Sequence, residues 1–512
     1  MGIFNDWLKG KSGFSTQEQA DELLNSTISS SNSTNLHHLS MLFSGIPELI
    51  IRKFPLKTGQ EAALVYMDGL VDKATINKEI LRPLLFYELN EKNFWESAVS
   101  IGQIKQTQKW SEIEQALLNG KSVLFVEGQL TVMQIETQGW PERQIQEPVM
   151  EVSLKGSHQG FTETASQSIA LIRRYIPSRE LKVMEFTVGE RAPSKLSMLY
   201  LGDVANEDIV KEMECRIQSI KVDTILNTGA LEELIEDKWC TPFPQLSITE
   251  RPDTVAHQIL KGGIAIVVDR SPGVLIGPMT FPTFFKTVDD YSVRSLVASF
   301  VRFLRFICFF VGIFTPALYI AMISFHYEVI PLKLLLKIGE SREQIPFPPL
   351  LEALLMELVL EMLREAAIRL PGPVGQTIGV VGGIVIGQAA VQAGIVSNIM
   401  VIVVSITAIA SFIIPDLEMS GGIRLIRFPM MIIASLFGMM GIITGMSVIV
   451  IHLLSLVSLG VPYFSPISPL HMSEMKDTFL RFPIQMLKKR PFSVRPKQLK
   501  RQGTSRESEG EE

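Results

Sequence analysis

The sequence predicts a chain in two parts: a soluble N-terminal region of two α+β or α/β subdomains, followed by an α-helical membrane domain with several spans. Its 512 residues suffice for two to four domains. The 20% of charged residues fit a charged soluble half joined to a very apolar half, with the boundary near residue 300. In the apolar half, glycines recur every fourth residue directly after a helix that carries three glutamates, which indicates close helix packing around something polar.

Both ends of the chain are predicted to lie outside the folded domains. No long apolar stretch follows the basic residues of segment 1–40, so we expect no secretory signal and a cytoplasmic N-terminal region. Residues 25–35 are rich in Ser, Thr and Asn, which predicts that 1–40 is a mobile leader. Segment 471–512 has a basic part and then an acidic end, which predicts a disordered tail.

Residues 41–160 and 161–290 are predicted to form the two subdomains. Short apolar or β-branched runs at 63–66, 123–126 and 183–188 lie beside turn residues and predict strands.

Two further elements are predicted in the second subdomain. Asn206 is a suitable N-cap for a helix whose apolar residues recur on one face. The runs 264–268 and 274–276 flank a Ser-Pro-Gly turn, which predicts a hairpin.

The soluble half contains no motif of a catalytic or cofactor site. It lacks a phosphate-binding loop, a GxGxxG after a strand, HExxH and GxSxG, so we expect no enzyme and no cofactor. The three cysteines have no zinc spacing, which predicts no metal site and favours a reducing compartment. The chain has a net charge of −5, and its soluble half shows no basic face. Both features argue against a nucleic-acid partner.

The membrane domain is predicted over residues 291–470. Its expected spans are 306–325, 378–396, 399–414 and 430–459, although the third is short for a full crossing and the fourth can break at one of its glycines. The lipid bilayer is therefore an expected partner of this half.

The charges that flank these spans predict the orientation. Arg302 and Arg305 place the start of the first span on the cytoplasmic side, and four crossings return the C-terminus there, where segment 481–501 is basic. Lys333 and Lys337 would then lie outside, against the positive-inside rule. This conflict favours an additional membrane-embedded element.

The helix predicted at 349–369 is the candidate for that element. Glu357, Glu361 and Glu365 share one face, with Arg364 placed to neutralise Glu361. A carboxylate in hydrocarbon costs roughly 2.5–3.5 kcal/mol, so these side chains should face a cavity, a partner or the interface. Three interpretations stay open: an interfacial amphipathic helix, a pore or vestibule lining whose acidic rings favour cations in a homo-oligomer, and a structural ion-pair network.

Gly375, Gly379, Gly383 and Gly387 also share one helical face. Without side chains there, another backbone can approach closely. The spacing predicts a packing surface between helices or subunits.

The stretch Thr-Glu-Arg-Pro-Asp at 249–253 has two interpretations. Arg251 and Asp253 can bind a partner, or a turn set by Pro252 can hold a local ion pair. The second makes the stretch part of the scaffold.

The chain also resembles the A subunits of GerA-family spore germinant receptors. The resemblance spans nearly all of the chain outside the leader and the tail. The segments that carry it are Gly160-Phe161-Thr162-Glu163, Phe243-Pro244-Gln245, 249–253, Asp289-Asp290-Tyr291, 345–398, 424–428 and Gly460-Val461-Pro462-Tyr463.

This resemblance implies an integral protein of the bacterial spore inner membrane that works with a transporter-like B subunit and a lipoprotein C subunit in nutrient-triggered germination. It also implies a homo-oligomer that forms a ligand-gated conduit for monovalent cations, with both termini on the cytoplasmic, spore-core side. Two other classes compete with the conduit. A scaffold that transmits a signal needs no pore, and a carrier would need more spans and an internal repeat.

Overall fold

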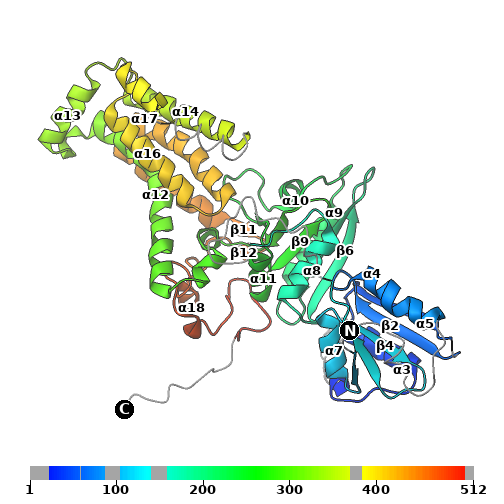
Figure 1. The fold of residues 1–512 in the computed structure, drawn as a ribbon. Coiled ribbons are helices and arrows are strands. Elements are labelled where there is room, and N and C mark those ends of the chain that lie inside the picture. Colours follow the sequence, from blue (N-terminus) through cyan, green and yellow to red (C-terminus); the bar gives the residue numbers. More distant parts are fainter. Residues whose placement is uncertain are drawn as a thin grey trace, which may run out of the picture. The chain divides into compact units, whose positions relative to one another are not determined.

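The computed structural model describes residues 22–57, 59–86, 104–139, 158–369, 383 and 385–501. The chain divides into two compact units. One comprises Met1–Ile235, Ile248–Gly277 and Val494–Gln498, and the other comprises Glu236–Ser247, Pro278–Ser493 and Leu499–Glu512. The first contains two mixed sheet-and-helix subdomains and the second is mainly helical, which confirms the predicted fold class (Figure 1).

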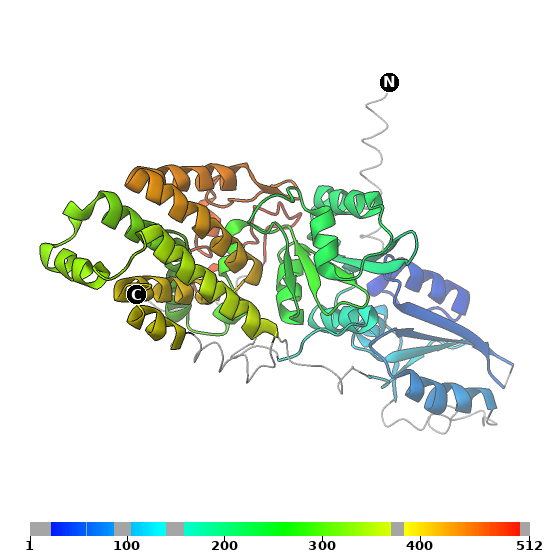
Figure 2. The same cartoon turned by 90° about the horizontal axis from the view of Figure 1, so that it is seen from above.

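The first sheet has the strand order β1-β2-β4-β5-β3, and its neighbouring strands are antiparallel. Its strands are β1 Leu49–Pro55, β2 Glu61–Met67, β3 Ile104–Thr107, β4 Ser122–Val126 and β5 Val132–Ile135. Strand β2 is almost wholly apolar because helices cover both faces of the sheet (Figure 2). Val65 packs in the core with α3 (Asn32–Leu42) and α7 (Trp110–Leu118), whereas Leu64 packs in the core that contains η1 (Ile76–Leu81).

The prediction of a mobile leader is wrong for residues 22–40, while residues 1–21 lie outside the described ranges. Helix α3 begins at Asn32 and buries Leu36 and Leu39 in the first core. The amide of Asn35 donates to the carbonyl of Ser29 at 2.7 Å and its oxygen accepts from the Ser29 amide at 2.9 Å. Polar side chains that bond to backbone in this way are compatible with burial, so a polar composition did not predict disorder correctly here.

The second sheet has the order β6-β7-β9-β10-β8. Its strands are β6 Leu181–Val188, β7 Ser194–Leu201, β8 Ser247–Thr249, β9 Ile264–Val268 and β10 Val274–Gly277, and its helices are α8 Ala165–Tyr175, α9 Glu207–Ser219, α10 Thr228–Ile235 and α11 Pro252–Leu260. Strands β9 and β10 form the predicted hairpin. The Asn206 side chain caps α9 by accepting from the Asp208 amide at 2.8 Å, as predicted.

Residues 249–253 contain a local ion pair at the start of α11. Pro252 is the first residue of this helix, where its fixed φ is favourable and its missing N–H removes no helical bond. Arg251, which is 3% exposed, donates from Nη2 to Asp253 Oδ2 at 2.7 Å. The ion pair agrees with the scaffold interpretation, although Pro252 opens a helix and not a turn.

The second unit contains α12 Ser295–Phe325, α13 Leu332–Arg342, α14 Pro349–Arg369, α16 Asn398–Ile413 and α17 Leu417–Ser455, among other helical segments. Ile320 of α12, Ala353 of α14, Met400 of α16 and Met431 of α17 meet in one apolar core. Within the described ranges, α12 and α17 are long and apolar enough to cross a membrane, and α16 is shorter. Of the predicted span 378–396, residues 378–382 and 384 lie outside the description.

Helix α17 is broken at Gly438, one of the glycines at which the sequence allows a break. Its φ of 60° and ψ of −139° are open to glycine and costly for other residues. A Cβ there would lie 3.1 Å from Phe325 at the end of α12. The break therefore depends on both the backbone conformation and the close approach of α12.

The prediction of a disordered tail is wrong for residues 471–501, and residues 502–512 lie outside the description. The segment contains the short helix α18 (Met472–Met475), buries Arg481 and Val494, and pairs Lys489 with Lys500. The basic composition of this segment predicted disorder incorrectly, because several of its charged side chains bond to other residues of the folded protein.

Candidate functional sites in the helical unit

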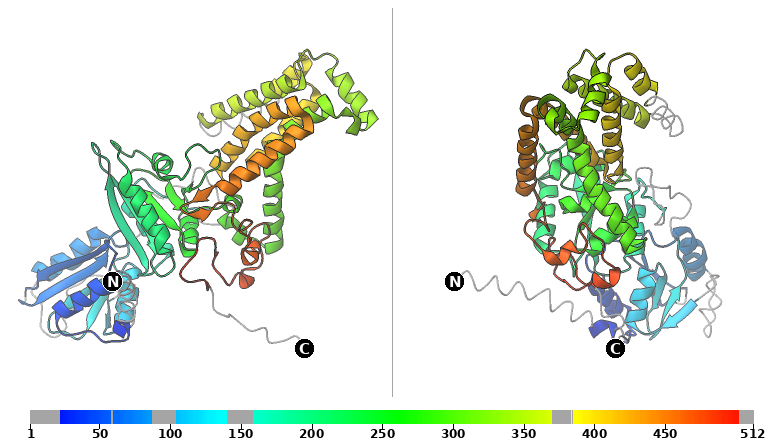
Figure 3. Two further views of the ribbon diagram at one scale, coloured as in Figure 1. Left: turned by 180° about the vertical axis from the view of Figure 1, so that it is seen from behind. Right: turned by 90° about the vertical axis from the view of Figure 1, so that its left-hand side faces the viewer.

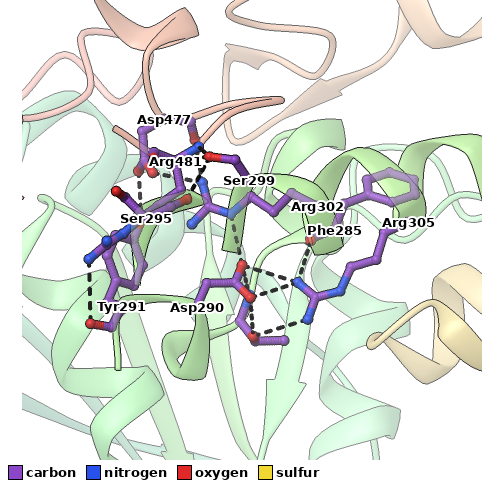
Figure 4. Close-up of polar contacts among 10 residues, drawn as sticks. Phe285, Asp290, Tyr291, Ser295, Ser299, Arg302, Arg305, Asp477 and Arg481 are labelled. Carbon is purple, nitrogen blue, oxygen red and sulfur yellow. Dashed lines mark hydrogen bonds and ion pairs between the residues drawn. The ribbon is translucent and has the colours of Figure 1, made fainter. Parts of the chain in front are cut away.

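A buried ion cluster lies near the beginning of α12 (Figure 4). Its centre is Asp290, which is 4% exposed and lies on the 3-10 helix η3 (Val288–Tyr291). Arg302 Nε donates to Asp290 Oδ2 at 2.8 Å, and Arg305 Nη1 donates to Oδ1 at 2.9 Å. The two guanidinium groups reach one carboxylate because positions 302 and 305 are neighbours on one helical face.

Asp477, from the segment after α18, is the second carboxylate of the cluster. It accepts from Arg302 Nη1 at 2.7 Å and from the Tyr291 hydroxyl at 2.6 Å. The Tyr291 ring lies 5.3 Å from the guanidinium carbon of Arg302 and 5.5 Å from that of Arg481. Burial, together with the charge of Asp477, raises the pKa of the Tyr291 hydroxyl, so it remains a donor. We call these six residues the Asp290 cluster.

The Asp290 cluster accounts for the two arginines inside an otherwise apolar helix. Arg302 and Arg305 are bound by carboxylates from segments that precede and follow the helices, so their charges are compensated within the protein. The apolar stretch 306–325 that follows is long enough to cross a bilayer, which takes about 20 residues.

Each of the three predicted glutamates of α14 has an arginine partner. Glu357 Oε2 accepts from Arg427 at 2.5 Å, Glu361 pairs with Arg424, and Glu365 pairs with Arg369 of its own helix at 2.6 Å. The exposed side-chain fraction rises along the helix from 4% to 45% to 59%. The acidic face thus runs from a buried end to an open end.

Arg364 does not pair with Glu361, contrary to the prediction. Its guanidinium carbon lies 4.4 Å from the centre of the Phe412 ring, a cation–π contact with α16. Arg424 of α17 takes the position beside Glu361. The sequence suggested the wrong arginine because Arg364 is only three residues from Glu361 on α14, whereas the helix packed opposite supplies the arginine that pairs with it.

Arg427 of α17 joins α12, α14 and α16. Its Nη1 binds Glu357 of α14, its Nη2 donates to Ser411 Oγ of α16 at 2.6 Å, and its Nε donates to the Gly312 carbonyl of α12 at 2.7 Å. A guanidinium is suited to this role because its five donors form a rigid planar group. Figure 3 shows α14 beside α17, where this contact is made.

The acidic face borders a cavity of about 790 Å³. Of the described residues that line it, seven are charged or hydroxyl-bearing and eight are apolar. The described residues that line it are Glu357, Leu360, Glu361, Leu363, Arg364, Ala367, Ile368, Ala408, Ser411, Phe412, Ile414, Leu417, Ser420, Arg424 and Arg427. Glu365 is not among them, so two of the three predicted glutamates reach this cavity and the third lies beyond it.

The predicted glycine face is described only in part, because Gly375 and Gly379 lie outside the described residues. A Cβ on Gly383 would have no described atom within 4 Å, and one on Gly387 would meet only Val401 at 3.8 Å. Within the description, nothing in the chain itself requires glycine at these two positions.

Sequence reasoning missed the importance of Arg427 and Asp290. A signal existed, because Arg424 and Arg427 are spaced by three residues within an apolar helix, which is costly unless both have partners. No pattern in the sequence identifies those partners, which lie 63 and 70 positions away.

No group of three or more His, Cys, Asp or Glu side chains placed to hold a metal occurs among the residues that the structure describes. The charged groups of the two sites are carboxylates and guanidiniums, and every carboxylate among them is paired with a guanidinium. Such a set can hold helices together, and it can be rearranged when those helices move apart.

The chain is thus a protein with a folded α+β region followed by apolar helices, two of which, among the described residues, are long enough to cross a membrane. The family described as Bacillus/Clostridium GerA spore germination protein matches residues 37–493. The chain belongs to this family, the A subunits of spore germinant receptors.

Several named proteins are similar to this chain over most of its length. Spore germination protein KA of Bacillus subtilis is 40% identical over 491 residues, which cover 94% of this chain and 90% of that protein. Uncharacterized membrane protein YfkQ of Bacillus subtilis is 40% identical over 461 residues, with 89% and 90% covered. Spore germination protein GerLA of Bacillus cereus is 37% identical over 466 residues, with 88% and 95% covered.

One solved structure is similar to the N-terminal part. It is the N-terminal domain of the A subunit of the Bacillus megaterium spore germinant receptor GerK3, at 29% identity and a TM-score of 0.40, covering 50% of this chain and 98% of that domain.

Proposed function

We propose that this chain is the membrane subunit of a nutrient germinant receptor and that it oligomerises into a ligand-gated conduit for monovalent cations. It works with a transporter-like B subunit and a lipoprotein C subunit in the spore inner membrane, with both termini on the cytoplasmic side. Membership of the family supports the role in germination. The conduit is supported by the contacts of α14.

The observation that supports the conduit is the acidic face of α14, whose glutamates are paired with arginines. Glu357 and Glu361 lie in the wall of a cavity among apolar helices, and arginines of α17 neutralise both. A conduit in this state is closed, because a carboxylate bound to a guanidinium offers little field to a passing cation. Separation of α14 from α17 would free the carboxylates, and one such helix per subunit would make them rings.

The acidic face would attract cations through charge and not through shape. Replacement of Glu361 or Glu365 by Gln keeps the size of the side chain and removes the charge. We expect Glu361→Gln and Glu365→Gln to reduce nutrient-triggered K⁺ and Na⁺ efflux from spores, while both variants still copurify with the B subunit. Glu340→Gln, on exposed α13, is the matched control and should leave efflux unchanged.

Normal efflux in both glutamate variants would remove the acidic face from the conduit. In that case the paired glutamates of α14 hold helices together, and the chain transmits the nutrient signal as a scaffold. Loss of copurification would instead report failed assembly, so the measurement separates the two causes.

A further inference from the structure

Within the described part of the chain, the cavity beside α14 contains one arginine that is not ion-paired with a carboxylate. Two of its three arginines, Arg424 and Arg427, are paired with Glu361 and Glu357. Arg364 is the third; its guanidinium contacts the Phe412 ring, and among the described residues it forms no ion pair with a carboxylate. An aromatic ring compensates a guanidinium charge less than a carboxylate does, so Arg364 retains the capacity to bind an anion.

The remaining wall of the cavity is apolar and reaches the surface. Ile368, Phe412 and Leu417 line it, and they are 73%, 68% and 56% exposed. Adjacent exposed apolar side chains of this size indicate a surface that another molecule covers. A volume of about 790 Å³ is also within the range of small-molecule sites, about 300–1,000 Å³.

We infer that this cavity binds an anionic amphiphile, and that its occupant in the membrane is an anionic phospholipid whose phosphate contacts Arg364 and whose acyl chain lies on the apolar wall. Charge selects the head group, because the other two guanidiniums are neutralised and one cation is left. The apolar wall selects the acyl chain, because its exposed apolar residues lie beside that cation. Basic pockets between membrane helices bind anionic lipids in this way.

The lipid site rests on the membrane placement proposed above and is independent of cation conduction. A free monocarboxylate with an apolar tail has the same chemistry, so the experiment must separate the two sources. The full chain, purified with its receptor partners, is placed in nanodiscs of equal phosphatidylglycerol and phosphatidylcholine. The lipid that remains bound after detergent extraction is then counted by mass spectrometry.

We expect the wild type to retain phosphatidylglycerol over phosphatidylcholine, and Arg364→Gln to retain about tenfold less, since a charge-assisted hydrogen bond is lost. Arg364→Lys should retain an intermediate amount. Arg369→Gln is the matched control on the same helix, because Arg369 is exposed and already paired with Glu365, and it should retain the wild-type amount. Equal retention of both lipids, or normal retention in Arg364→Gln, would overturn the inference.

A second measurement uses only the wild-type protein, so it does not depend on whether a variant folds. A photoactivatable phosphatidylglycerol should crosslink in the wild type to peptides that contain Phe412 or Leu417. If hexanoate binds lipid-free protein through Arg364 while phosphatidylglycerol neither binds nor crosslinks, the occupant is a free carboxylate and the lipid assignment is wrong. Neither result changes the efflux measurement on Glu361 and Glu365, so failure of the lipid site and failure of the conduit are distinguishable.

Discussion

The Nε of Arg427 donates to the carbonyl oxygen of Gly312 at 2.7 Å, and this carbonyl is the one left without a helical donor by Pro316. In a regular helix the amide four residues later would fill that role, but proline has no N–H. Arg427 of α17 replaces the missing donor of α12 and uses its other nitrogens on Glu357 and Ser411. One side chain thus satisfies a backbone defect and a buried charge together.

This arrangement predicts that Arg427→Met strongly destabilises the protein and that a second substitution restores much of the lost stability. Loss of the guanidinium leaves Glu357 buried without a partner, which costs about 3–5 kcal/mol when one member of a buried pair is removed. Glu357→Leu combined with Arg427→Met should recover most of that loss, because two apolar groups replace two charges. Thermal unfolding of the purified, detergent-solubilised protein measures both, and additive losses in the double variant would contradict the coupling.

The Asp290 cluster predicts a pH dependence that Tyr291→Phe removes. At neutral pH the variant should be less stable by about 1.5–3 kcal/mol, since the bond from the hydroxyl to the Asp477 carboxylate is lost. The pKa of Tyr291 is raised in the folded state, so its contribution is complete below the unfolded pKa of about 10 and is lost as the pH rises above it.

The difference in stability between the wild type and Tyr291→Phe should therefore decrease between about pH 10 and pH 11. Melting temperatures measured in steps from pH 8 to pH 11 test this. Parallel curves for the two proteins over the whole range would mean that Tyr291 ionises as freely in the folded state as in the unfolded state.

The break in α17 predicts that Gly438→Ala destabilises the protein by about 1–3 kcal/mol, because alanine must adopt a backbone conformation suited to glycine and meets Phe325. Gly421→Ala on the same helix is the control. A Cβ there would meet only Arg424 at 3.6 Å, so this change should be neutral or stabilising by up to about 1 kcal/mol. Equal melting temperatures for the two variants would show that Gly438 has no special requirement.

The proposed oligomer predicts that Gly383→Leu disrupts assembly. No described atom lies within 4 Å of a Cβ at this position, so leucine fits within the described chain and a defect would report a contact with another chain. Gly339→Leu on α13 is equally unhindered and serves as the control. Crosslinking and size-exclusion chromatography of membrane extracts should give smaller assemblies for the first variant alone. Normal assemblies in both would assign the glycine face another role.

Local sequence patterns determine much of the fold. The cap at Asn206, the hairpin of β9 and β10 and the extent of α14 follow from capping, turn chemistry and apolar spacing, which act over a few residues. The same local reasoning misjudged residues 25–35 and 471–501, since polar residues that bond to backbone or to distant charges look like solvent-exposed ones in a sequence.

The sequence by itself determined the class of the chain, its two-part architecture and the acidic face of α14. Only the tertiary structure decided the partners of those charges: Arg427 for Glu357, Arg424 for Glu361, and Phe412 for Arg364. The physical reason is that an ion pair between helices depends on which faces pack together, and this is set by the whole apolar core. Spacing within one helix cannot determine that choice.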